Sequence, residues 1–170
     1  MFDPDQDDLE VRLMQADEFG IKLEIVQGTY TWEFFPSPFH QGAVQRVQQS
    51  IRTKPGGVEG CGCFSIQDIY IRFPDGSIKR PDLSIFCKEP ELTRQALTLV
   101  PDAVVEIVSP GGEKKDLDVG PSFYLSQGVK DVVVSNPDSL GVFRLRIDLA
   151  DKESDRQAGD GSDGGSALGR

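Results

Sequence analysis

Two acidic residues lie beside apolar segments that have the pattern of buried β-strands. Asp82 opens the apolar part of "KRPDLSIF", and Glu106 lies inside "DAVVEIV". An ionised carboxylate is rarely buried unless it has a partner or binds a metal. If the two strands are neighbours, the carboxylates can converge on Mg²⁺, which takes one or two carboxylates and keeps water molecules for a phosphate substrate. From spacing alone, solvated or capping carboxylates are the commoner case.

The segments around these carboxylates are predicted to form a series of β-strands. Each has alternating or continuous apolar residues and is bounded by turn residues. Gln27-Gly28 predicts a hairpin between the first two, and the apolar run around Glu106 predicts a central strand. The imperfect alternation of "CFSIQDIYIRF" predicts one strand with a bulge. The predicted strands are residues 21–26, 29–35, 63–73, 78–87, 102–108, 130–136 and 141–148.

Helical segments separate these strands. Residues 38–52 predict a helix that Ser37 caps and Pro38 begins, and a polar, partly helical segment covers 113–127. Helices between strands indicate an α/β domain with a mixed sheet. We expect this domain to span residues 20–150. An acidic arm at 1–19, partly disordered with a short helix from Leu9, precedes it, and a disordered tail rich in Gly, Ser and Asp follows at 151–170.

The charge of the chain is concentrated at its ends. The formal net charge is −10, but residues 1–20 hold seven acids and one arginine, and residues 151–170 hold five acids and three bases. The remaining residues are nearly neutral, so the total charge does not exclude a nucleic-acid partner. Six basic residues are candidates for phosphate contacts: Arg46, Arg52, Lys54, Arg72, Lys79 and Arg80.

The cysteines and the apolar runs argue against a secreted or membrane protein. Cys61, Cys63 and Cys87 lack zinc or redox spacing and predict small apolar residues on strands. The acidic amino terminus is unlike a signal peptide, and no apolar run reaches the length of a membrane span. We therefore expect a cytoplasmic protein.

Three segments resemble the Uma restriction-endonuclease family, within the PD-(D/E)XK nuclease superfamily. They are "RPDLSIF", "PDAVVEIVSP" and "YLSQGVKDVVVSNP", in that order, and "WEFFPSPFHQ" resembles the family's amino-terminal part. The resemblance covers about residues 20–148. It implies a restriction-endonuclease-like α/β fold, with a central mixed sheet of four or five strands flanked by helices.

The resemblance also implies an activity and a site. Asp82 and Glu106 would be paired ligands of Mg²⁺ or Mn²⁺ on adjacent strands, in an endonuclease that cuts DNA phosphodiesters. The family places an acidic residue and a histidine near the metal, which gives Glu33 and His40 as further candidates, although Thr29 fits the place of Glu33 equally well. A homodimer is usual for enzymes that cut two strands. As an isolated histidine near a helix start, His40 is more often a hydrogen-bonding structural residue.

The chain departs from the family at the lysine. The superfamily places its lysine two residues after the glutamate, where this chain has Val108. The Uma family places it on the following helix, where this chain has Gly120, followed by Pro121. Proline is poorly tolerated inside a helix, so the helix is expected to break or restart there. Lys114 and Lys115 are the candidate substitutes, although each alone reads as a solvated lysine.

Three functions remain open from the sequence. The first is a Mg²⁺-dependent endonuclease, and the second is a nuclease-like domain that has lost catalysis and serves in nucleic-acid or protein interaction. The third is a structural or assembly protein without a site. Gly120-Pro121 favours the second over the first, whereas the presence of both Asp82 and Glu106 favours the first over the third.

Overall fold

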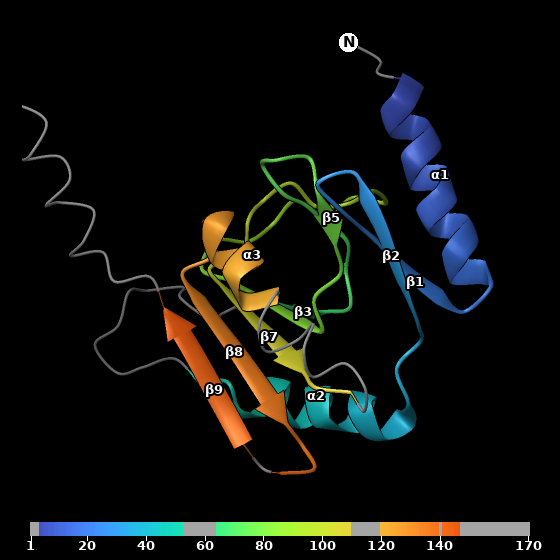
Figure 1. The fold of residues 1–170 in the computed structure, drawn as a ribbon. Helices are drawn as coiled ribbons and strands as arrows, with labels where there is room; N and C mark the ends of the chain where they lie inside the picture. Colours follow the sequence, from blue (N-terminus) through green and yellow to red (C-terminus); the bar gives the residue numbers. More distant parts are fainter. Residues whose placement is uncertain (1–3, 53–63, 110–119, 140, 147–170) are drawn as a thin grey trace, which may run out of the picture.

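A computed structural model describes residues 4–52, 64–109, 120–139 and 141–146, which form two β-sheets and three helices (Figure 1). The larger sheet has five strands in the order β3-β6-β7-β8-β9 and the smaller has four in the order β2-β1-β5-β4. The strands of the larger sheet are β3 (Phe64–Gln67), β6 (Leu83–Phe86), β7 (Ala103–Ile107), β8 (Asp131–Asn136) and β9 (Gly141–Arg146). Those of the smaller sheet are β1 (Ile21–Val26), β2 (Thr29–Phe34), β4 (Ile71–Arg72) and β5 (Ile78–Lys79).

The larger sheet is mixed, and β7 lies at its centre as predicted. β7 runs antiparallel to β6, with Leu83 opposite Val105, and parallel to β8, with Glu106 opposite Val134. The parallel pair requires a crossover connection, which includes α3 (Gly120–Ser126). The apolar run of β7 therefore reflects a strand covered on both faces.

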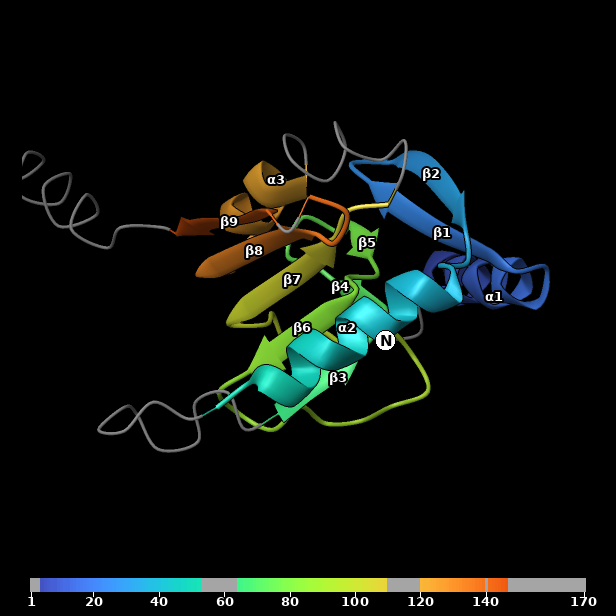
Figure 2. The ribbon, with the colours of Figure 1, turned by 90° about the horizontal axis from the view of Figure 1, so that it is seen from below.

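Each face of the larger sheet packs on a different layer. On one face, Ala43 and Val44 of α2 (Pro38–Ser50) pack with Leu83, Val105 and Ile107, and Figure 2 shows α2 running across β6. The other face forms a second cluster that includes Phe86, Val104, Val132 and Val134 of the sheet, Tyr124 of α3, and Ile71 of the smaller sheet. Because side chains alternate along β7, Glu106 faces this second layer.

The helices begin and end where the local sequence allows. Ser37 caps α2 by accepting a hydrogen bond from the backbone N–H of His40, and Pro38 is its first residue. The described part of α3 begins at Gly120 with Pro121 in its first turn, and the residues that would show the predicted break or restart lie outside the described residues. α1 (Pro4–Glu18) contacts β1 and begins earlier than the short helix expected from Leu9.

Two predicted strands are divided between the sheets. The segment expected as one bulged strand forms β3 in the larger sheet and β4 in the smaller, with Asp68 between them at φ 54°. The next segment likewise forms β5 and β6, which are joined by Arg80, Pro81 and Asp82. The two predicted strands are therefore too long, because the chain crosses between two sheets, whereas the expected mixed sheet of four or five strands is present as the larger sheet.

Other expectations are corrected or lie outside the described residues. Cys87 is half-buried and disulfide-bonded, so its interpretation as an unpaired apolar residue is wrong. The bases Lys79 and Arg80 pair internally with acidic side chains rather than lying free for phosphates. The tail at 151–170 lies outside the described residues. Within the described ranges, no helix has the length and hydropathy to cross a membrane.

Candidate functional site

Asp82 and Glu106 lie side by side at the junction of the two sheets. The backbone N–H of Asp82 donates to Glu106 Oε2 at 3.4 Å, and the N–H of Ile107 donates to Asp82 Oδ2 at 2.7 Å. Both residues are buried, with exposed fractions of 8 % for Asp82 and 9 % for Glu106. The antiparallel pairing of β6 with β7 brings them together, as the sequence predicted.

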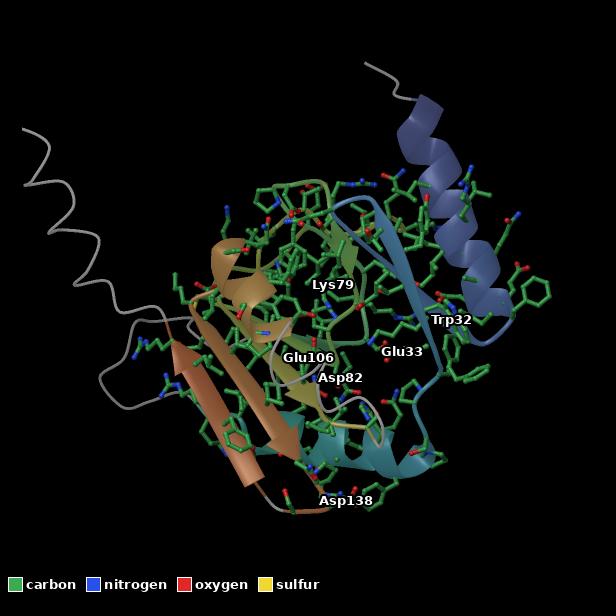
Figure 3. All side chains as sticks on the ribbon, in the orientation of Figure 1. Trp32, Glu33, Lys79, Asp82, Glu106 and Asp138 are labelled. Atoms are coloured by element: carbon green, nitrogen blue, oxygen red, sulfur yellow. The ribbon has the colours of Figure 1, made fainter. Side chains whose placement is uncertain are left out.

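A small cavity of about 40 Å³ opens beside this carboxylate pair. Its lining comes from both sheets and from α2 and α3. The lining residues are Lys22, Glu24, Glu33, Phe34, Pro36, His40, Lys79, Asp82, Glu106, Ile107, Ser109 and Gly120. Figure 3 shows Glu33 on the side of β2 that faces Asp82 and Glu106, whereas Trp32 points away from them.

Lys22 and Glu33 enter the cavity from the hairpin of the smaller sheet. They are cross-strand partners in the pairing of β1 with β2, and Lys22 Nζ lies 3.2 Å from Glu33 Oε1. The same ammonium lies 3.9 Å from Asp82 Oδ1. Lys22 is therefore held between the hairpin's carboxylate and the carboxylate that precedes β6.

His40 approaches Asp82 from the first turn of α2. Its Nε2 lies 3.1 Å from Asp82 Oδ1, and its Nδ1 lies 3.0 Å from Ser109 Oγ. The Nε2 contact has the distance of an ion pair but not the alignment of a hydrogen bond, so this buried atom has no hydrogen-bond partner among the described residues. His40 is thus fixed between Asp82 and Ser109 and holds one side of the Asp82 carboxylate.

A second buried ion pair, Lys79 with Glu24, lines the same cavity as Glu106. Lys79 Nζ lies 3.2 Å from Glu24 Oε2, and Glu24 Oε1 also accepts the backbone N–H of Arg80 at 2.9 Å. The Lys79 ammonium lies 5.1 Å from the ring centroid of Tyr124, whose hydroxyl donates to Glu106 Oε1 at 2.5 Å. Glu106 is therefore held by a tyrosine and by the backbone of the chain before β6.

The two carboxylates have opposite electrostatic environments. Burial and the charge of Asp82 raise the pKa of Glu106 to about 7, against partial compensation by Lys22 and Lys79. Burial also acts to raise the pKa of Asp82, but His40 and Lys22 outweigh it and lower that pKa. The pKa values of two carboxylates that share a site separate in this way, because each charge opposes ionisation of the other group.

The basic groups respond to the same charges. Burial acts to lower the pKa of His40, but Asp82 outweighs it and raises that pKa. Burial likewise acts to lower the pKa of Lys22, and Glu24, Asp82 and Glu106 together raise it well above the ordinary range. Both groups therefore favour their charged forms beside the carboxylates.

The cavity carries an excess of negative charge once its acidic groups are ionised. Above the raised pKa values of Glu106 and His40, four carboxylates face two lysines, which leaves two negative charges without a counter-charge, and these match a divalent cation. In the described part of the chain, no three His, Cys, Asp or Glu side chains form a ready set of metal ligands. Two carboxylates with water in the remaining positions is nevertheless an ordinary arrangement for Mg²⁺.

The cavity gathers most of the residues that the sequence singled out. Asp82, Glu106, His40 and Glu33 all line it, whereas Lys114 and Lys115 lie outside the described residues. Gly120 also lines it, so α3 contributes no charge at the position where the Uma resemblance places a lysine.

Sequence reasoning missed three buried partners of this cavity, which are Lys22, Glu24 and Tyr124. The signal for two of them was present in "IKLEIV", where Lys22 and Glu24 alternate with apolar residues. Such alternation normally marks a solvent face. Here that face is buried, with Lys22 close to Glu33 and Asp82 and with Glu24 paired with Lys79.

Comparisons with known proteins agree with this architecture. The sequence profile of the Uma2 family, described as "Putative restriction endonuclease", matches residues 7–163. A crystal structure of "a putative nuclease belonging to DUF820" from Anabaena variabilis superposes with a TM-score of 0.59 at 19% sequence identity, covering 74% of this chain and 72% of that chain. No relative was found among curated proteins. The expected restriction-endonuclease-like α/β fold is thereby confirmed.

Proposed function

Because the chain belongs to the Uma2 restriction-endonuclease family, we propose that it is an endonuclease that uses Mg²⁺ or Mn²⁺ to hydrolyse DNA phosphodiester bonds. The observation that carries the proposal is the buried pair Asp82 and Glu106, joined through the backbone N–H of Asp82 and lining one cavity with two further carboxylates. Burial and the charge of Asp82 oppose the ionisation of Glu106 and so raise its pKa, and a bound divalent ion offsets that cost.

The residues present suit such an ion. Asp82 and Glu106 would hold it, since both expose carboxylate oxygens to the cavity and are fixed by other groups. The N–H of Ile107 orients Asp82, and the hydroxyl of Tyr124 orients Glu106. When bound, a divalent cation lowers the pKa of a water molecule and offsets charge on the phosphoryl oxygens.

The reaction that fits this site is a simple hydrolysis. A water molecule attacks phosphorus, so one P–O bond forms and the ester P–O bond to the leaving oxygen breaks. The water proton passes to solvent and the leaving oxygen takes up a proton, with no change of oxidation state. The fixed carboxylates position the attack, and a site built before the substrate arrives needs little reorganisation in the transition state.

The test is plasmid nicking with added Mg²⁺ or Mn²⁺, using wild type, Asp82→Asn and Glu106→Gln. Wild type should nick only with the metal, and each variant should lose about a hundredfold or more in rate, since a single carboxylate holds Mg²⁺ poorly. Metal-dependent nicking that persists in Asp82→Asn would refute the assignment of the site.

One observation favours a second function. Gly120 lines the cavity and brings no charge from α3, which suits a nuclease-like domain that binds nucleic acid or protein without cutting. Calorimetry separates the two functions. Metal binding by wild type without any nicking would favour the interaction module.

A further inference from the structure

Two lysines line the cavity, and their surroundings differ. Lys79 is paired with Glu24 at 3.2 Å, and its ammonium lies over the rings of Tyr124 and Phe123. These contacts fit a role in stabilising the fold. Lys22 instead contacts the carboxylate pair itself, with its ammonium 3.9 Å from Asp82 Oδ1.

The backbone directs Lys22 into the cavity. Its β1 position is paired across the hairpin with Glu33, and the side chain is only 8 % exposed. A buried ammonium of this kind has lost its water shell and much of its rotamer freedom on folding. It is therefore already fixed beside Asp82 when a substrate arrives.

Lys22 and Gly120 lie on elements that are far apart in the sequence but line one cavity. α3 offers no side chain there, while β1 offers an ammonium. We propose that Lys22 is the catalytic lysine of this site, supplying from β1 the positive charge that contacts the phosphate and the attacking water. The inference rests on the proposed nuclease function and names the residue that completes it.

The chemistry suits an ammonium beside the two carboxylates. Negative charge grows on the phosphoryl oxygens during attack, and a fixed cation in a water-poor cavity stabilises it more strongly than bulk water does. A lysine is also a compact point charge with three donors, which can bond a carboxylate and a phosphate oxygen at the same time. The carboxylate of Glu33, 3.2 Å away, keeps the ammonium in place.

The test measures cleavage and metal affinity in the same variants. Lys22→Met keeps most of the side-chain volume and removes the charge, and Lys130→Met removes an exposed lysine that pairs with Asp102 away from the cavity. Lys22→Met should nick plasmid about 10²- to 10³-fold more slowly, whereas Lys130→Met should match wild type. Calorimetry with Mn²⁺ alone should show that Lys22→Met binds it several-fold more tightly, because an ammonium that opposes the cation is gone.

A second-site variant distinguishes catalysis from support of the fold. Adding Gly120→Lys to Lys22→Met places a lysine on another element that lines the same cavity and should recover at least tenfold of the lost rate. Lys22→Arg should retain part of the rate, since it keeps the charge but changes its shape. Thermal melting of each variant confirms that it is folded.

The outcomes separate the two proposals. Wild-type nicking that Lys22→Met leaves unchanged overturns the role of Lys22 and leaves the proposed function standing. Loss of rate together with loss of Mn²⁺ binding, without recovery in the double variant, overturns it in favour of a structural lysine. A wild-type protein that binds Mn²⁺ and never cuts overturns the proposed function and this role with it.

Discussion

A glutamate in the centre of the larger sheet is costly to bury in its ionised form. Successive side chains of β7 point to opposite faces of the sheet, so Glu106 shares a face with Val104. It lies against the layer that holds Tyr124. Its pKa is raised to about 7 by burial and by Asp82. The folded protein therefore holds a proton on Glu106 at pH values where the unfolded chain has released it.

This proton makes the stability of the metal-free protein depend on pH. The folded-state pKa of Glu106 lies above its ordinary value of 4.5, so the free energy of unfolding should fall as the pH rises from about 4.5 to about 7. Glu106→Gln removes this penalty and should stabilise the protein by about 1–3 kcal/mol at a pH of about 8. The gain should vanish near a pH of about 4.5. Urea unfolding in the presence of a chelator measures this difference in the free energy of unfolding. Parallel curves of that free energy against pH for wild type and Glu106→Gln would contradict the prediction.

Asp82 provides the matched control with the opposite sign. Its pKa is lowered because His40 and Lys22 outweigh burial, so its contribution is present above the ordinary pKa and is lost as the pH falls through the folded-state value. Asp82→Asn leaves His40 without its carboxylate and Lys22 with Glu33 alone among its ion-pair partners in the described residues, and should destabilise the protein by about 3 kcal/mol near neutral pH. In the same urea series, the free energy of unfolding should therefore rise for Glu106→Gln and fall for Asp82→Asn, relative to wild type. Equal changes in both variants would show that both carboxylates are merely solvated.

At the scale of elements, periodicity identified strands but not the sheet to which each belongs. The β1–β2 hairpin, α2 and the central position of β7 followed from turn residues, a cap and an apolar run, all of which act within a few residues. The divisions at Asp68 and at Arg80–Asp82 did not, because a strand that leaves one sheet and enters another keeps the same apolar alternation. The crossing is set by packing between sheets, which a local pattern does not contain.

The sequence likewise predicted only part of the candidate site. Asp82 and Glu106 were found because charge interrupts apolar strands, and His40 and Glu33 because of the family resemblance. Lys22 and Glu24 were missed, since their alternation in β1 matches a solvent face and only the second sheet makes that face internal. Long-range burial was thus the information that the sequence pattern lacked.

The hairpin that carries Lys22 and Glu33 depends on its turn. Gln27 and Gly28 have φ values of 50° and 78°, a conformation that suits two-residue hairpins and favours glycine. Gly28→Ala should destabilise the protein by about 1 kcal/mol through strain at this φ, even though open space surrounds the new methyl group.

Gly42 in α2 is the control for the hairpin prediction. A Cβ there would meet only the Arg46 side chain, at 3.5 Å, and Gly42→Ala should stabilise the protein by about 0.5–1 kcal/mol because alanine favours the helix. Chemical denaturation of both variants gives the comparison. A Gly28→Ala protein as stable as Gly42→Ala would show that the turn does not constrain the hairpin.

At the scale of the whole molecule, the candidate site lies where the two sheets meet. The smaller sheet supplies Lys22, Glu24, Glu33 and Lys79, while Glu106 comes from the larger sheet and Asp82 from the segment that joins them. Figure 1 shows β1 and β2 on one side of this junction and β7 on the other. Above the pKa of Glu106, the excess negative charge of the cavity therefore acts across the junction, and its neutralisation should stabilise both sheets together.

This arrangement predicts that a divalent cation stabilises the folded protein, because a ligand that binds only the folded state adds RT ln(1 + [L]/Kd) to its stability. At a free Mn²⁺ concentration of about 100 times Kd the gain is about 2.7 kcal/mol, or a rise of roughly 5–10 °C in the melting temperature. The rise should be larger at a pH of about 8 than at about 5.5, because Glu106 must lose its proton to accept the metal. Thermal melting with MnCl₂, against NaCl of equal ionic strength, measures it, and Asp82→Asn should show almost no rise. If Mn²⁺ and NaCl gave the same melting temperature at the higher pH, the carboxylate pair would not be a metal site.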